Sequence, residues 1–153
     1  MNNQSHAAQV TREGMFALNC HADRAFPLFS PEGEQIWVPG WDATPVFPAD
    51  RMPLEPDTVF TTSELHGPAT WVIASTDARA RRTEYVAFEP RTHCGHITVQ
   101  VEALEEGHCR VHARYVITAF GEHREEMLRR FDEGPFRERM TNWKEWIERT
   151  LRR

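Results

Sequence analysis

Hydrophobic and polar residues alternate with a period of two along the chain between Ala43 and Phe120. This alternation predicts six strands, which are separated by short stretches rich in Pro, Gly and Asp, as turns commonly are. The predicted strands are Thr44–Phe47, Thr58–Glu64, Ala69–Thr76, Arg82–Glu89, His93–Leu104 and Cys109–Phe120. An earlier segment, Gly14–Cys20, predicts a seventh strand. Strands in series with short turns indicate an antiparallel meander.

The spacing of apolar residues changes at both ends of this meander. Beyond Gly121, large apolar residues recur at spacings of 4, 3, 4 and 4: Phe136, Met140, Trp143, Ile147 and Leu151. Such spacing places them on one face of an α-helix. Pro135 lacks a backbone donor and is expected to kink or restart that helix. Residues 21–41, interrupted by Pro and Gly, predict two short helices instead.

The turn between the last two strands decides how they pair. A two-residue turn at Glu106-Gly107 would put an arginine and a histidine on the apolar face. A three-residue loop, Glu105–Gly107, instead pairs apolar residues: Val101 with Val111, Val99 with Ala113, and Ile97 with Tyr115. A one-residue slip would turn each side chain to the wrong face, so we expect the three-residue loop, with Gly107 left-handed.

Composition places the chain among ordinary globular domains. Its 153 residues are 40% hydrophobic and 27% charged, which fits a single domain over residues 1–153, with residues 1–9 frayed. The net charge of −5 argues against a nucleic-acid partner. Three cysteines are too few for a disulfide framework. Because no apolar run approaches the roughly 18 residues that span a bilayer and no signal peptide is recognisable, we expect a cytoplasmic protein without stable membrane insertion.

The order of the predicted elements resembles the helix-grip fold of the SRPBCC superfamily, which includes START, birch-pollen-allergen and polyketide-cyclase proteins. Ala22–Glu34 and Trp37–Trp41 are similar to the helical segment of small bacterial members. Val59–Thr62, Thr70–Ile73 and Tyr115–Ala119 are similar to their strands. The resemblance implies an α+β fold. In that fold a curved antiparallel sheet of about seven strands wraps a long C-terminal helix, and two short helices follow the first strand.

The resemblance also implies a cavity between the sheet and the C-terminal helix. Members of the superfamily bind lipids, sterols, quinones or aromatic polyketides there, and a minority perform chemistry. We therefore hypothesise binding or carriage of a small hydrophobic ligand. A cyclase/dehydratase-type enzyme with Tyr115 as hydrogen-bond donor stays open, as does a protein-interaction module without a ligand. The sequence leaves a homodimer open as well.

Candidate cavity residues are the large side chains that face each other from the helix and the sheet. They are Trp37, Trp41, Trp71, Tyr85, Val99, Val101, Tyr115, Phe136, Met140 and Trp143. Ala113 and Ala119 lie among them and are expected to leave room for a ligand. For each tryptophan, packing in the core is the competing interpretation, because buried aromatic side chains dominate core energetics.

The histidines and cysteines predict neither a metal site nor a cofactor. His108 and His112 lie four residues apart on a predicted strand, roughly 13 Å at about 3.3 Å per residue, and cannot share an ion. His93 and His96 point to opposite faces of a regular strand. Histidines on the solvent face of the sheet are the simpler interpretation.

No catalytic residue can be assigned from the sequence. The acidic pair Glu32 and Glu34 is typical of a solvated helix face. Spacings that suggest a Ser-His-Asp or Cys-His nucleophile are absent, as are glycine-rich phosphate loops.

Overall fold

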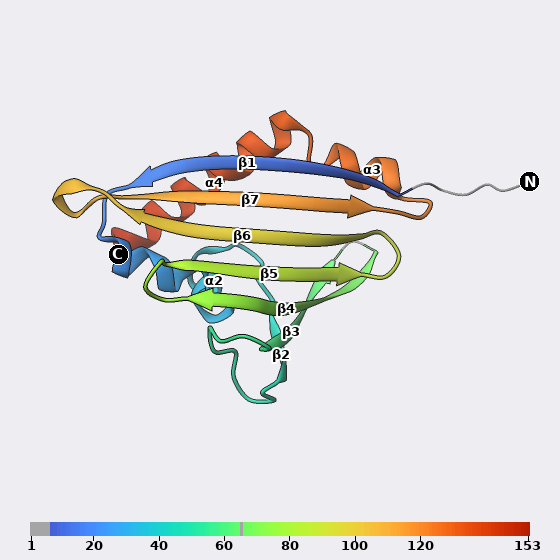
Figure 1. Cartoon of the computed structure of the whole chain (residues 1–153), viewed down its shortest axis with the longest axis horizontal. Coiled ribbons are helices and arrows are strands. Elements are labelled where there is room, and N and C mark those ends of the chain that lie inside the picture. The colour runs from blue at the N-terminus through green and yellow to red at the C-terminus, as the bar shows by residue number, and fades with distance from the viewer. Residues whose placement is uncertain (1–6, 65) are drawn as a thin grey trace, which may run out of the picture.

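The computed structural model of the chain describes residues 7–64 and 66–153. Seven antiparallel strands form one sheet in the order β1-β7-β6-β5-β4-β3-β2. The strands are β1 (Ala8–Leu18), β2 (Thr44–Phe47), β3 (Val59–Glu64), β4 (Gly67–Asp77), β5 (Arg82–Glu89), β6 (His93–Ala103) and β7 (Cys109–Ala119). All the helices except the short turn η2 lie behind the sheet in Figure 1, so one face of the sheet is covered and the other is open.

The two short helices predicted after the first strand are present. They are α1 (Ala22–Ala25) and α2 (Pro31–Trp37), joined by the 3₁₀ turn η1 (Phe26–Phe29). The Ser30 hydroxyl accepts a hydrogen bond from the Gly33 amide at 2.9 Å and so caps α2. Pro31 occupies the first helical position, where its missing N–H costs nothing.

The predicted three-residue loop is also confirmed. Val101 pairs with Val111, and Ile97 pairs with Tyr115. The loop forms the short 3₁₀ turn η2 (Glu105–Gly107), and Gly107 has a φ of 74°. Glu106 is left-handed too, with a φ of 57°, so the loop differs from a type I turn followed by one left-handed residue.

The first strand is longer than the sequence predicts. β1 begins at Ala8, and residues 8 and 9, expected to be frayed, pair with Ala119 and Thr118 of β7. Their backbone groups continue the ladder although the side chains carry little apolar alternation. Residues 1–6 lie outside the described part of the chain.

The C-terminal tail forms two helices, α3 (Arg124–Arg129) and α4 (Glu133–Leu151). A restart of the helix was predicted at Pro135, but the break falls just before it, at residues 130–132. Pro135 lies in the first turn of α4, where a missing donor is tolerated. The Arg12 side chain donates to the Phe131 carbonyl at 2.8 Å and fixes this joint to β1.

Helix α4 packs on the covered face of the sheet, as predicted. Phe136, Met140, Trp143 and Ile147 are buried. A Cβ atom on Gly14 of β1 would lie 2.6 Å from Met140 Cγ, so only glycine permits this close approach. No helix in the described part of the chain is both long and apolar enough to cross a membrane.

Strand β2 forms one edge of the sheet. It pairs only with β3, and its register shifts between Pro45 and Phe47. Val46 and Phe47 are exposed there.

Candidate ligand-binding cavity

A cavity of about 180 Å³ lies between the covered face of the sheet and the joint of α3 and α4. Its apolar lining comes mainly from the strands: Ala69, Trp71, Ala87, Gly95, Ile97, Ile117, Met127 and Phe131. Its polar lining is Glu64, His93, Tyr115, Arg130 and Arg139. The connections β3–β4, β5–β6 and β7–α3 gather at this end of the sheet, on the right in Figure 1.

The cavity exists because small residues meet at the centre of the sheet. Ala87 of β5 pairs with Gly95 of β6, and Trp71 and Ile117 flank this pair on the neighbouring strands. Helix α4 packs mainly on β1 instead and reaches this space only through Arg139. Because the side chains of Ala87 and Gly95 are small and α4 packs mainly elsewhere, a void remains that is larger than those of a close-packed core.

Tyr115 and Arg139 form the most clearly polar corner of the cavity. The Arg139 guanidinium lies 5.4 Å from the centre of the Tyr115 ring and 5.0 Å from that of Phe131. Burial raises the pKa of Tyr115 to about 12, although the neighbouring Arg139 charge opposes this shift. Tyr115 therefore keeps its proton at neutral pH and can donate a hydrogen bond.

Glu64 and His93 are held by threonines in the cavity wall. Trp71 Nε1 donates to the Thr62 hydroxyl at 2.9 Å, and this hydroxyl donates to Glu64 Oε1 at 3.1 Å. His93 Nδ1 lies 2.8 Å from the Thr92 hydroxyl. Burial lowers the pKa of His93, so its ring is neutral near pH 7. The other ionisable side chains of the lining are two arginines and one glutamate besides Tyr115.

Two of the ten predicted cavity residues, Trp71 and Tyr115, line this space. The other eight do not: Trp37, Trp41, Tyr85, Val99, Val101, Phe136, Met140 and Trp143. The rings of Phe29, Trp37 and Trp143 pack against one another with centroids 5.6–6.0 Å apart. Which of these residues contact a ligand stays a prediction, but most of them belong to a packed core.

The polar atoms of this packed region bond to nearby backbone. Trp37 Nε1 donates to the Leu28 carbonyl at 2.6 Å, and the Tyr85 hydroxyl donates to the Phe29 carbonyl at 2.5 Å. Trp41 Nε1 donates to the Pro31 carbonyl at 2.8 Å. These side chains anchor α2 and η1 and do not offer free donors to a ligand.

Ala113 was expected to leave room for a ligand, and the structure shows why it does not. Ala113 pairs with Gly14 of β1. The Gly14 position lies against the side chains of Met140 and Phe136, which occupy the space above it. Small residues under α4 therefore bring the helix closer, whereas Ala87 and Gly95, away from α4, leave a cavity.

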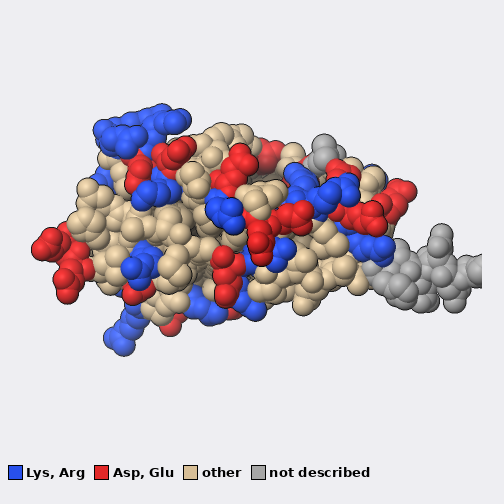
Figure 2. Space-filling view, turned by 90° about the horizontal axis from the view of Figure 1, so that it is seen from above, with Lys and Arg blue, Asp and Glu red and all other residues tan. Residues whose placement is uncertain are grey.

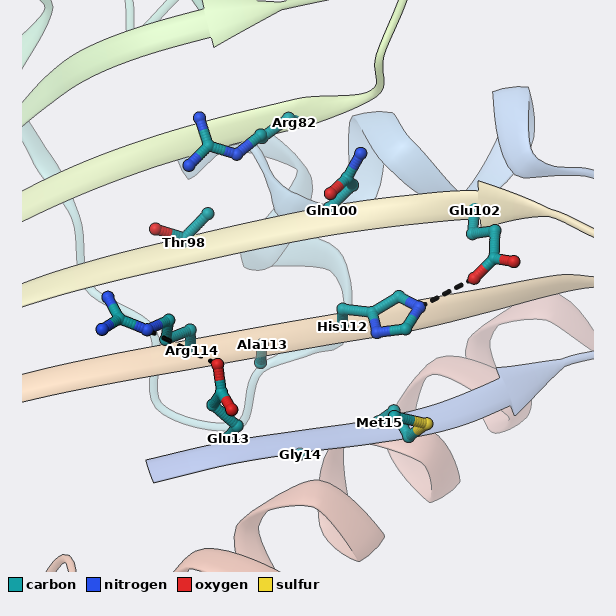
Figure 3. Close-up of a pocket in the computed structure, with 10 residues that line it drawn as sticks. All are labelled: Glu13, Gly14, Met15, Arg82, Thr98, Gln100, Glu102, His112, Ala113 and Arg114. Atoms are coloured by element: carbon teal, nitrogen blue, oxygen red, sulfur yellow. Dashed lines mark hydrogen bonds and ion pairs between the residues drawn. The ribbon is translucent and has the colours of Figure 1, made fainter. Parts of the chain in front are cut away.

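A second hollow, a groove of about 610 Å³, lies on the open face of the sheet. Figure 3 shows its charged side chains, which project from β1, β5, β6 and β7. His112 Nε2 lies 2.8 Å from Glu102 Oε2, and Arg114 Nε lies 3.5 Å from Glu13 Oε1. Paired charges in an open groove are typical of a solvated sheet face, so the cavity on the covered face is the better candidate.

Glu34 departs from the solvated role predicted for it. Its side chain is half-buried on α2. Burial raises the pKa of Glu34 well above its ordinary value, and its charge raises the pKa of both Tyr85 and Tyr115. Burial and these two tyrosines, rather than solvent, thus set the environment of the Glu34 carboxyl group. Glu32, in contrast, is exposed and accepts from the Met52 amide at 3.0 Å.

Basic and acidic side chains are intermingled over most of the face drawn in Figure 2, and a group of basic side chains gathers at its upper left. The absence of a nucleic-acid partner, the cytoplasmic location and the homodimer stay predictions.

Comparison with solved structures identifies the fold. Norcoclaurine synthase from Thalictrum flavum, in complex with dopamine and hydroxybenzaldehyde, superposes with a TM-score of 0.66 at 11% identity, over 92% of this chain and 87% of that chain. Ara h 8.0201 superposes with a TM-score of 0.64 at 12% identity, over 95% of this chain and 100% of that chain. An uncharacterised protein from Rhizobium leguminosarum superposes with a TM-score of 0.64 at 18% identity, over 96% of this chain and 97% of that chain. This chain has the helix-grip fold.

At these identities the likeness establishes the helix-grip fold and leaves the function open. No family model and no curated protein matches the sequence. The function must therefore be argued from the cavity itself.

Proposed function

We propose that the chain binds a small aromatic or short-chain amphiphile that carries an anionic group. The observation that supports this proposal is a cavity of about 180 Å³ that combines apolar strand side chains with polar groups, among them Arg139 and Tyr115. Ligand sites commonly combine an apolar wall with a few orienting polar groups.

The size of the cavity limits the ligand. An apolar cavity of about 150 Å³ accommodates benzene, whereas sites for drug-sized molecules occupy about 300–1,000 Å³. A single ring or a short chain therefore fits the cavity better than a sterol or a polycyclic polyketide. The helix-grip neighbour in complex with dopamine and hydroxybenzaldehyde also holds single-ring molecules.

The charges of the lining favour an anionic group. Arg130 and Arg139 bring two positive charges, Glu64 brings one negative charge, and His93 is neutral. Arginine binds carboxylates through paired hydrogen bonds. Tyr115, held protonated by burial, is suited to donate a further hydrogen bond to such a group.

The polar groups of the cavity favour binding over catalysis. General acid–base chemistry at neutral pH needs groups whose pKa lies near 7. Tyr115 is shifted away from that range to about 12, and Glu64 and His93 are already engaged by threonines. The presence of a cavity between the sheet and the helix joint in turn favours a ligand-binding protein over an interaction module.

Two experiments test the proposal. Native mass spectrometry of the purified protein should detect a co-purified small molecule. Titration with benzoate and with its uncharged analogue benzamide, followed by NMR, should show tighter binding of benzoate. Saturable shifts are expected at Trp71 and Ile97 in the cavity.

Matched variants locate the site. Ala87→Leu should abolish benzoate binding because it fills the cavity, whereas Ala74→Leu, at an exposed position of the neighbouring strand, should preserve it. Arg139→Leu should weaken benzoate binding by about tenfold or more, since charge-assisted hydrogen bonds contribute about 1.5–3 kcal/mol. Arg137→Leu, exposed on the same helix, is the control. Unchanged benzoate binding by Ala87→Leu would overturn the proposal.

A further inference from the structure

Two histidines and a glutamate meet beside the cavity, where the β3–β4 turn approaches α3. Of the residues that the structure describes, His66, His123 and Glu126 form the one group whose ligand atoms could hold a metal ion; these atoms all lie within 4.8 Å of one another. The three side chains are half-buried. The sequence did not suggest this group because His66 and His123 are far apart along the chain.

The distances within the group suit a shared ion better than direct hydrogen bonds. His66 Nε2 lies 3.4 Å from Glu126 Oε1, and His123 Nδ1 lies 3.5 Å from Glu126 Oε2. Hydrogen bonds from nitrogen to oxygen usually measure about 2.7–3.2 Å. Two ligands of a tetrahedral zinc ion, each about 2.1 Å from the metal, lie about 3.4 Å apart.

A second carboxylate supports His123 from its other side. Glu122 Oε1 lies 3.7 Å from His123 Nε2, while His123 Nδ1 faces Glu126. Metal-binding histidines commonly have a carboxylate near the nitrogen that does not bind the ion, which fixes the ring and raises its basicity.

The surroundings of the group leave one coordination position open. A hollow lined by His66, Arg91, Glu122 and His123 lies against it. Arg91 would oppose a bare cation, but it suits an anion or hydroxide in the fourth position. The two imidazole rings are stacked, with centroids 3.9 Å apart and planes 17° apart, so they must splay for one ion to lie in both ring planes.

We infer that His66, His123 and Glu126 form a binding site for a divalent transition-metal ion of the zinc type. The ion bridges the β3–β4 turn and helix α3. Glu64, the last residue of β3 before this turn, and Met127 of α3 both line the cavity, so the ion fixes two of its walls to each other. Two histidines, one carboxylate and an open position suit Zn²⁺ or Co²⁺ rather than Ca²⁺ or Mg²⁺, which prefer oxygen ligands.

Titration of the metal-free full-length chain with Co²⁺ tests this inference without any organic ligand. We expect one equivalent to bind and to give the visible absorption of four- or five-coordinate Co²⁺, and Zn²⁺ to displace it. His66→Ala, His123→Ala and Glu126→Gln should each weaken binding by at least about tenfold. Glu122→Gln, which leaves the three ligands in place, should weaken it by about tenfold, as loss of an outer partner commonly does.

His108→Ala is the matched control, because His108 is exposed in the loop at the opposite end of the sheet. It should bind Co²⁺ like the wild type. Circular dichroism and urea unfolding of each variant separate loss of a ligand from loss of the fold. Binding by folded His66→Ala and His123→Ala as tight as that of the wild type would overturn the inference, as would no specific Co²⁺ binding by the wild type. Neither result would overturn the proposed ligand site, which Ala87→Leu and Arg139→Leu test in metal-free protein.

Discussion

The covered face of the sheet has two halves of opposite character. In one half, Trp37 and Trp143 pack edge to face with centroids 5.6 Å apart, and Trp143 also contacts the rings of Phe29 and Tyr115. In the other half, Ala87 and Gly95 lie under a cavity of about 180 Å³. Both halves contain aromatic residues and small residues.

The difference lies in what stands above the small residues. Gly14 and Ala113 face α4 and allow its side chains to descend, so a dense core results. Ala87 and Gly95 lie away from the axis of α4, where α3 and its joint reach the sheet only through larger side chains such as Met127 and Phe131. A small residue therefore signals a cavity only where no helix can approach it.

The largest expected effect is a loss of stability in the packed half. Trp143→Ala should lower the free energy of unfolding by about 3–5 kcal/mol, because it leaves a cavity among Phe29, Trp37 and Tyr115. It should also weaken benzoate binding through loss of support for Tyr115. Urea unfolding and benzoate titration measure the two effects. Trp146→Ala, at a half-buried position, should cost less than about 1 kcal/mol, and equal losses would contradict the division into halves.

A pair of strand glycines compares the halves directly. Gly14→Ala should destabilise by about 1–3 kcal/mol, because the new Cβ would lie 2.6 Å from Met140 Cγ. Gly95→Ala should be neutral or stabilise slightly, since its Cβ meets only Ile117 Cδ1, at 3.3 Å, and alanine restricts the unfolded chain. Thermal unfolding of both variants measures the two changes in stability. A larger loss of stability in Gly95→Ala than in Gly14→Ala would contradict a packed half at Gly14 and a cavity at Gly95.

In the β6–β7 loop, Glu105–Gly107, we expect a substitution of Gly107 to change stability through backbone strain alone. Gly107 has a φ of 74° and open space where a Cβ would lie. Gly107→Val should therefore destabilise by about 1–2 kcal/mol through its left-handed backbone. Gly107→Asn should cost clearly less, because asparagine tolerates this conformation. Equal urea midpoints for valine and glycine would show that the loop relaxes.

The smallest expected effect is a pH dependence at Glu34, between the halves. Because burial raises its folded pKa above the ordinary value of 4.5, the folded state resists deprotonation. Glu34 therefore makes its full contribution to the free energy of unfolding below pH 4.5. That contribution is lost as the pH rises towards the pKa of Glu34 in the folded state. The stability gained by Glu34→Gln should grow over that range. The free energies of unfolding of wild type and Glu34→Gln, measured in urea across this pH range, would run parallel if this were wrong. Because the side chain is half-exposed, the expected effect is modest.

Periodicity predicted most of the fold because the sheet has one covered face. The strand boundaries fall within a few residues of those expected, apart from the start of β1, and the register of β6 with β7 follows from keeping Val101 and Tyr115 on the covered face. The helix break was misplaced slightly because Pro135 fits the first turn of a helix as well as it interrupts one.

The sequence was sufficient to predict a cavity between the sheet and the C-terminal helices, but not its position on the sheet. Its lining depends on which strand lies under which helix, and periodicity does not encode the path of α4 across the sheet. The pairing of Ala87 with Gly95 was available from the short β5–β6 turn and was the signal missed. Arg139 lies beside the apolar stripe of α4, so its contact with Tyr115 appears only once the helix is placed.

The short edge strand β2 bears on how copies of this chain behave at high concentration. An exposed strand edge with apolar side chains, such as Val46 and Phe47, favours pairing with a strand of another molecule and hence aggregation. Pro45 offers no N–H to an incoming strand, and the register shift that follows it breaks the regular spacing of the remaining groups. Both features disfavour the pairing of a further strand at this edge, despite its exposed apolar side chains.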